Sequence, residues 1–155
     1  MTPTATRGEG SPAPLAPTLE DACRRWSGRP ALTFGGETTS YETLWQRVMS
    51  LAGAYERLGV SRGDRVLCQL RNCPEHIVAT GAAWLRGAVH VGADNDLTAA
   101  ELSRLVERLE ARVLLFQPSL ARPGDLGALA TVAAEHPSTQ LIVHAADAGA
   151  YQTLG

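Results

Sequence analysis

The stretch Leu70 to His76, LRNCPEH, carries the side chains best suited to chemistry: a thiol, an imidazole, a carboxylate and a guanidinium. A cysteine beside a helix N-terminus can have a lowered pKa, and His76 could then act as the base for Cys73. Thiol enzymes, however, take the base from elsewhere in the fold and orient it with a third group. No such partner is identifiable, whereas Pro74 and Glu75 suit the first turn of a helix. We therefore favour a structural junction and keep a Cys73 nucleophile as the alternative.

Other chemical sites are not indicated by the sequence. His90 in AVHV and His144 in LIVHA are interpreted as half-buried strand residues. No His, Cys, Asp or Glu residues have metal-ligand spacing, so no metal site is expected. The sequence Asp94-Asn95-Asp96 lacks the glycine and the terminal glutamate of a calcium loop, and predicts a polar loop at a strand end. Neither phosphate-binding glycine pattern occurs, and no catalytic residue is assigned.

Composition narrows the classes of function. The chain has 155 residues, enough for one domain, and a net charge of -2 without runs of like charge, so no nucleic acid partner is expected. All 14 basic residues are Arg, which excludes Schiff-base and other lysine chemistry. No apolar run approaches the roughly 20 residues of a membrane span. Cys23, Cys68 and Cys73 lack C-x-x-C spacing, which predicts free thiols and a cytoplasmic location.

The first third of the chain predicts a leader, a helix, a strand and a longer helix. Residues 1–17 are rich in Pro and Gly and are interpreted as a flexible leader. Thr18 is the expected N-cap of a short helix over 19–26, and residues 31–34 form a strand before a Gly-Gly turn. A helix with one apolar face begins at Ser40 and ends at Gly59, which suits a left-handed cap.

The remainder alternates strands and helices. Strands are expected at 65–70, 88–91, 111–118 and 140–145. Between them lie a helix that ends at Gly87, a second with a capping box of Thr98 and Glu101, and an Ala-rich helix over 125–135. The connections are long enough for right-handed crossovers. The predicted fold class is therefore α/β, with a mostly parallel, doubly wound sheet.

Three pieces of sequence, in order and spacing, resemble the adenylate-forming superfamily of acyl-CoA synthetases and related ligases. They are SYETL at 40–44, GVSRGDRV leading to NCPE at 59–75, and WLRGAV leading to LT at 84–98. The resemblance identifies an N-terminal subdomain, so that 18–155 would be a partial AMP-binding domain. Its structural motif positions here are Tyr41, Gly63, Asp64, Asn72, Pro74, Glu75 and Gly87.

The resemblance also implies a function. Such enzymes use ATP to convert a carboxylate into an acyl-adenylate, and pass the acyl group to CoA or to a carrier protein. ATP, Mg and CoA are thus implied for the full-length family, and none is expected to bind to this segment alone. The phosphate loop with its lysine and the other catalytic motifs would follow Gly155, so the expected function is that of a truncated N-terminal portion, not catalytic by itself.

The resemblance further implies that a loop containing Gly92, Asp94 and Asn95 borders the nucleotide of the thiol acceptor. The expected partner is the remaining part of an adenylating enzyme, or a second copy of the chain. An alternative from a different class is a non-catalytic binding or scaffold module that pairs with an adenylating enzyme or an acyl carrier. Cooperative unfolding of the isolated chain would favour this alternative.

Overall fold

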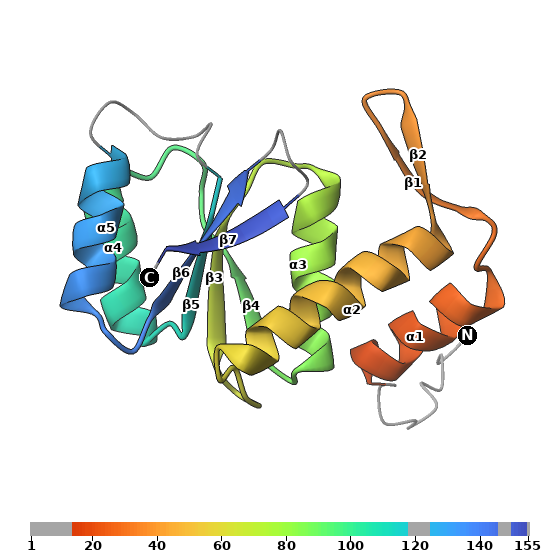
Figure 1. The fold of residues 1–155 in the computed structure, drawn as a ribbon, viewed down its shortest axis with the longest axis horizontal. Coiled ribbons are helices and arrows are strands. Elements are labelled where there is room, and N and C mark those ends of the chain that lie inside the picture. Colours follow the sequence, from red (N-terminus) through yellow and green to blue (C-terminus); the bar gives the residue numbers. More distant parts are fainter. Residues whose placement is uncertain (1–13, 118–124, 146–149, 155) are drawn as a thin grey trace, which may run out of the picture.

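The computed structural model describes residues 14–117, 125–145 and 150–154. From β3 onward, strands and helices alternate, as predicted, until a final strand follows β6 (Figure 1). The elements are α1 (Leu15–Arg25), β1 (Pro30–Phe34), β2 (Glu37–Ser40), α2 (Tyr41–Arg57), β3 (Arg65–Gln69), α3 (Pro74–Leu85), β4 (Val89–Gly92), α4 (Ala99–Leu109), β5 (Val113–Phe116), α5 (Asp125–Glu135), β6 (Gln140–Ala145) and β7 (Ala150–Leu154).

The main sheet has the strand order β4-β3-β5-β6-β7. The first four strands are parallel, and β7 pairs antiparallel with β6. Within this sheet β3 comes first in the sequence, and β4 then lies on one side of it and β5 on the other. The order of the strands across the sheet therefore reverses between β3 and β5. The predicted α/β fold with a mostly parallel, doubly wound sheet is confirmed, although strand β7 was not predicted.

Helices cover both faces of this sheet. The helices α1, α2 and α3 lie on one side of the sheet and α4 and α5 lie on the other (Figure 1). Val66 and Cys68 of β3 belong to the core beneath α2 and α3, whereas Leu67 belongs to the core beneath α4 and α5. Strands buried on both faces are continuously apolar. This burial explains the apolar runs in β3 and β5.

The termini of α2 follow the sequence signals. The Ser40 hydroxyl accepts a hydrogen bond from the backbone N–H of Thr43 and so caps the first turn. At the other end, Gly59 has a φ of 74° and Val60 donates its N–H to the carbonyl of Tyr55. This is a Schellman motif, in which a glycine adopts the left-handed conformation at low cost.

Two arginines satisfy carbonyl groups near the amino ends of the strands. Arg65 donates to the carbonyls of Leu109 and Glu110, at the end of α4. Arg112 donates from Nε and Nη2 to the carbonyl of Leu58, at the end of α2. Helix ends leave carbonyls without intrahelical partners, so these bonds fix two helices against the sheet. At the amino ends of the strands, hydrogen bonds therefore hold α2 and α4 to the sheet.

The first helix departs from prediction at its start. α1 begins at Leu15, and Thr18 lies inside it, with its hydroxyl donating to the carbonyl of Pro14. Thr18 is thus not the N-cap, and residues 15–17, which the composition predicts to be part of the flexible leader, are helical. Residues 1–13 of that predicted leader lie outside the described residues.

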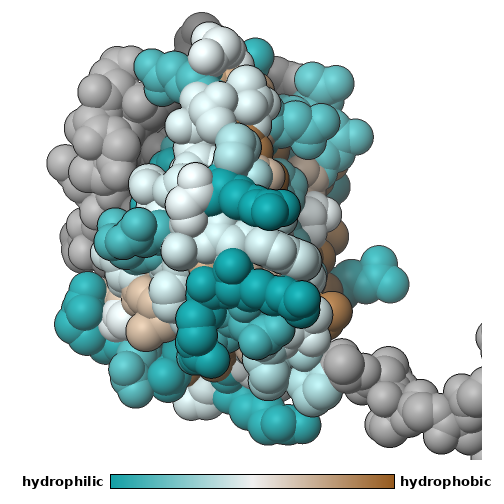
Figure 2. Space-filling view, turned by 90° about the vertical axis from the view of Figure 1, so that its right-hand side faces the viewer, coloured by the Kyte–Doolittle hydropathy of each residue, from teal (hydrophilic) through white to brown (hydrophobic). Residues whose placement is uncertain are grey.

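The strands β1 and β2 form an antiparallel hairpin that projects beyond the main sheet and leads directly into α2 (Figure 1). Gly35 and Gly36 both have positive φ, at 59° and 85°, as a two-residue turn of type I′ requires. The face on the right-hand side of Figure 1 is mostly hydrophilic or intermediate in hydropathy, with hydrophobic areas that are small and separate (Figure 2). In the described parts of the chain, no helix is long and apolar enough to cross a bilayer.

Candidate functional site

A hollow of about 560 Å³ lies beyond the carboxyl ends of β3 and β5. Open α/β sheets bind ligands at this edge, where the strand order reverses, and pockets of roughly 300–1,000 Å³ suit small ligands. Its walls come from the hairpin, α2, the junction between β3 and α3, and the residue after β5. The lining residues are Phe34, Glu37, Thr39, Arg47, Arg71, Asn72, Cys73, Pro74, Glu75 and Gln117.

The junction LRNCPEH therefore lines the hollow, and an ion pair fixes it in place. Pro74 is the first residue of α3, as predicted, and Glu75 forms an ion pair with Arg47 of α2. Burial has the largest single effect on the Glu75 carboxyl and raises its pKa, but the hydrogen bonds from Arg47, the backbone and Cys73, together with the charge of Arg47, outweigh it, so that the net shift is downward. Glu75 is thus a carboxylate that ties the start of α3 to α2.

Two groups in the hollow are available to an anionic ligand. Gln117 is only 7% exposed, and its Oε1 accepts a hydrogen bond from the backbone N–H of Arg71 at 3.0 Å. Within the described residues, neither the Gln117 Nε2 group nor the Arg71 guanidinium has a hydrogen-bond or ion-pair partner. An amide donor beside a guanidinium suits carboxylate or phosphate oxygens.

The geometry does not activate the Cys73 thiol. Burial raises its pKa, and the neighbouring groups have smaller effects in both directions. The His76 ring is directed elsewhere, since its Nε2 lies 3.1 Å from Nε2 of His90. Glu75 is engaged by Arg47 and does not orient an imidazole. The nucleophile hypothesis thus lacks both the thiolate and the base that it needs.

A second loop at the same edge holds the residues predicted to border the thiol acceptor. Gly92 is the last residue of β4, and Asp94 and Asn95 follow it in an exposed turn. The buried Gln69 donates from Nε2 to the carbonyls of Asp94, at 2.9 Å, and Leu97, at 3.0 Å. The structure thus places the three residues in one loop next to β3, but none of them lines the hollow.

Most of the remaining motif positions stabilise helix ends and turns and do not line the hollow. Tyr41 begins α2, and its ring packs against Trp26 with centroids 5.8 Å apart. Gly63 and Gly87 have positive φ and are joined by a backbone hydrogen bond of 2.9 Å. Asp64 accepts a hydrogen bond from the backbone N–H of Ser61 through its carboxylate. Asn72, by contrast, is exposed and lines the hollow.

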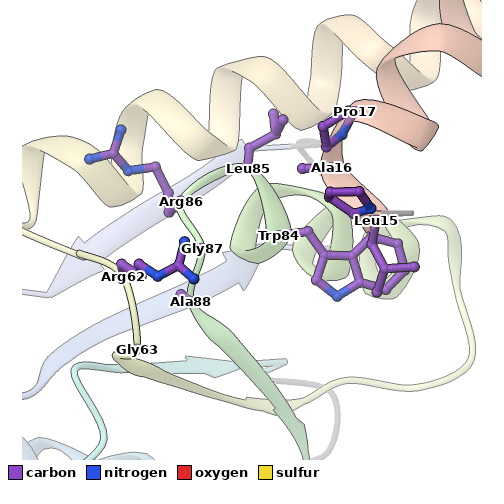
Figure 3. Close-up of a pocket in the computed structure, with 11 residues that line it drawn as sticks. Leu15, Ala16, Pro17, Arg62, Gly63, Trp84, Leu85, Arg86, Gly87 and Ala88 are labelled. Carbon is purple, nitrogen blue, oxygen red and sulfur yellow. The ribbon is translucent and has the colours of Figure 1, made fainter. Parts of the chain in front are cut away.

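A second hollow, of about 690 Å³, lies at the amino ends of the strands (Figure 3). Trp84 and Leu15 line one end of it, and Arg62 and Arg86 lie at the other (Figure 3). Arg86 is already used, because it donates to the carbonyl of Val60 and forms an ion pair with Glu56. The hollow at the carboxyl ends lies where the strand order reverses and is therefore the better candidate site.

Sequence reasoning missed three residues of the carboxyl edge: Arg47, Gln69 and Gln117. Gln69 ends β3 and Gln117 follows β5, so each follows an apolar run. A polar amide at the end of a buried run is the signal that could have found them, since buried amides require hydrogen-bond partners. Arg47 gave no such signal, because its partner Glu75 is distant in sequence. In the described parts of the chain, no group of three or more His, Cys, Asp or Glu residues could hold a metal ion.

A family model described as "AMP-binding enzyme" matches residues 19–155. The salicyl-AMP ligase / salicyl-S-ArCP synthetase of Mycobacterium tuberculosis is 33% identical in an alignment over 143 residues that covers 88% of this chain and 25% of that protein. The 2-hydroxy-7-methoxy-5-methyl-1-naphthoate–CoA ligase of Streptomyces carzinostaticus is 34% identical over 125 residues, 81% of this chain and 22% of that ligase.

Solved structures agree with the sequence comparisons. A benzoate CoA ligase from Burkholderia xenovorans superimposes with a TM-score of 0.71 at 27% identity, over 84% of this chain and 25% of that one. The chain therefore spans about a quarter of the length of these relatives.

Proposed function

The chain belongs to the family of AMP-binding enzymes, and we propose that it forms the N-terminal portion of an ATP-dependent ligase that activates a carboxylic acid as its adenylate. The observation that carries this proposal is the family match over residues 19–155 on a fold whose ligand-binding edge is open. Fold alone does not assign function, so the proposal needs both the family match and a hollow in which a ligand could bind.

This chain lacks two of the features on which phosphoryl chemistry commonly depends, a lysine and a phosphate-binding glycine loop. Charge that develops on the transferred phosphorus is stabilised in such reactions by lysine, arginine, metal ions or backbone N–H groups. The chain has no lysine and neither phosphate-binding glycine pattern. We therefore place the binding of ATP and Mg²⁺ in the rest of such an enzyme, and expect no adenylation by these 155 residues alone.

The carboxyl edge would contribute positioning. The loop with Gly92, Asp94 and Asn95 is proposed to border the nucleotide of CoA, with Gln69 holding its backbone in place. The Arg71 guanidinium and the Gln117 amide would complete the polar lining of the hollow beside it. Both groups follow the carboxyl ends of parallel strands, which are rigid supports for a ligand site.

The proposed substrate class is an aromatic carboxylic acid. Three of the proteins compared above are named for salicyl, naphthoate and benzoate groups. The proposed partner is the remaining part of an adenylating enzyme, or a second copy of this chain. A cytoplasmic location, expected from the three free thiols, completes the proposal.

A chimeric ligase tests the proposal. This chain would replace the matching N-terminal quarter of the benzoate CoA ligase, and acid-dependent exchange of pyrophosphate into ATP would be measured with benzoate, salicylate and acetate. We expect exchange with an aromatic acid from the chimera and none from the 155-residue chain alone.

The controls distinguish the alternatives. A chimera that unfolds cooperatively but shows no exchange would overturn the proposal and favour a non-catalytic module. Exchange by the isolated chain would instead show that the missing groups are not needed. The parent ligase, purified in parallel, supplies the reference rate.

A further inference from the structure

Two histidines from different elements face one another at the free edge of the main sheet. His76 lies in the first turn of α3 and His90 lies in β4, the edge strand. Their Nε2 atoms are 3.1 Å apart, and their rings are tilted by 50° with centroids separated by 5.1 Å. Both side chains are partly exposed. The pair is therefore reachable from solvent, and each ring presents the same nitrogen to the other.

We propose that His76 and His90 form a two-histidine site for a late first-row divalent cation such as Zn²⁺, Ni²⁺ or Cu²⁺, with water completing the coordination. Imidazole is a ligand suited to these cations, which bind nitrogen far better than Mg²⁺ does. Two nitrogens at 2.0–2.1 Å from a tetrahedral Zn²⁺ are about 3.4 Å apart. The present separation therefore needs to open by only a few tenths of an ångström.

A buried thiol next to His90 favours the required tautomer. The Sγ atom of Cys68 lies 3.6 Å from Nδ1 of His90. Histidines that bind metals donate the other ring N–H to a neighbouring acceptor, which orients the ring. If Nδ1–H of His90 points at the sulfur, its Nε2 is left with the lone pair that a cation needs. Cys68 would thus be a positioning residue and not a ligand.

One atom of the pair makes it costly as a purely structural contact. Nδ1 of His76 is buried and has no hydrogen-bond partner among the described residues. A buried polar atom without a partner is costly, and two apolar side chains would fill the same place without that cost. A cation bound at Nε2 would leave Nδ1 of His76 unpaired as well, so the geometry that supports the site is the facing pair of Nε2 atoms, 3.1 Å apart.

A cation bound at this site would link α3 to β4. The first turn of α3 follows the junction that lines the hollow, and β4 leads into the loop of Asp94 and Asn95. A cation that binds only the folded chain stabilises it in proportion to the logarithm of its concentration. At a hundredfold excess over the dissociation constant, the thermal midpoint should rise by about 5–10 °C.

Metal titration of the 155-residue chain tests the proposal, in a Cys73→Ser background that removes the partly exposed thiol. We expect one Zn²⁺ per chain by calorimetry, no heat with Mg²⁺, and at least about tenfold weaker Zn²⁺ binding in His76→Gln and in His90→Gln. His136→Gln is the matched control, because this histidine lies in the loop before β6, and its affinity should equal that of the parent.

Nitrogen NMR of the parent chain makes the test independent of whether the variants fold. Zn²⁺ should move the Nε2 resonances of His76 and His90 together and leave those of His136 in place. Unmoved resonances of the pair, or equal affinities in His90→Gln and His136→Gln, would overturn the proposal. Because the ligase reaction is not part of this readout, failure here would leave the proposed function unaffected.

Discussion

The buried amide of Gln69 should control the order of the loop that follows β4. Its Nε2 group donates to two loop carbonyls, at 2.9 Å and 3.0 Å, and the side chain is 1% exposed. A hydrogen bond contributes a net 0.5–1.5 kcal/mol, so Gln69→Leu should lower the free energy of unfolding by about 2 kcal/mol. For a chain of this length, that loss corresponds to a fall in thermal midpoint of about 4–8 °C.

Two further variants test whether the two hydrogen bonds donated by Gln69 are the cause of the loss of stability. Gln69→Glu keeps the shape but directs carboxylate oxygens at two carbonyl oxygens, so it should cost more than Gln69→Leu. Gln46→Leu changes the same residue type on the exposed side of α2 and should stay within about 0.5 kcal/mol of the parent.

Urea denaturation followed by circular dichroism measures the stability, and amide hydrogen exchange measures the loop. Exchange of the amides of residues 93–97 should accelerate in both Gln69 variants but not in Gln46→Leu. If Gln69→Leu unfolds at the parent urea concentration, or if loop exchange is unchanged, the two bonds do not hold the loop and the reasoning is refuted.

Three other predictions concern stability and reactivity. Burial lowers the pKa of His90 to about 4, so between pH 6.5 and pH 4 the unfolded chain binds a proton that the folded chain does not. In EDTA, the free energy of unfolding should therefore fall over this range by about 1–2 kcal/mol, after allowance for partial exposure. Urea midpoints that do not change with pH would contradict this. In urea denaturation, Gly59→Ala should lower the free energy of unfolding by about 1 kcal/mol more than Gly63→Ala does. Both glycines have positive φ, but only at Gly59 would a Cβ atom lie 2.6 Å from the Arg112 side chain. Equal losses of stability would show that Arg112 moves freely. Cys73 should react with iodoacetamide at pH 7.5 no faster than glutathione does, because burial raises its pKa, and a much faster rate would restore the thiol-enzyme hypothesis.

The predictions that succeeded rest on signals contained within one element. Ser40, and the capping box of Thr98 with Glu101, mark their helix starts because the capping bonds span only three residues. Thr18 failed for an equally local reason. The first turn of a helix does not need its N–H groups, so Pro17 is tolerated inside α1, although proline-rich sequence predicts a leader there.

The candidate site was less predictable because its contacts are distant in sequence. The partners Arg47 and Glu75 are 28 residues apart, and Gln117 bonds to the backbone of Arg71 across 46 residues. No periodicity or spacing encodes such pairs, and only the reversal of strand order brings them to one edge. The pairing of His76 with His90 is hidden in the same way.

The central place of β3 has a consequence for the chain during its synthesis. Val66 pairs with His90 on one side and with Val113 on the other, which emerges 47 residues later. At about 5–20 residues per second, β3 would wait roughly 2–10 s for its second neighbour on the ribosome. During that interval an apolar strand with an unpaired edge is open to other nascent chains. Codons that slow translation between β4 and β5 should therefore increase co-translational aggregation.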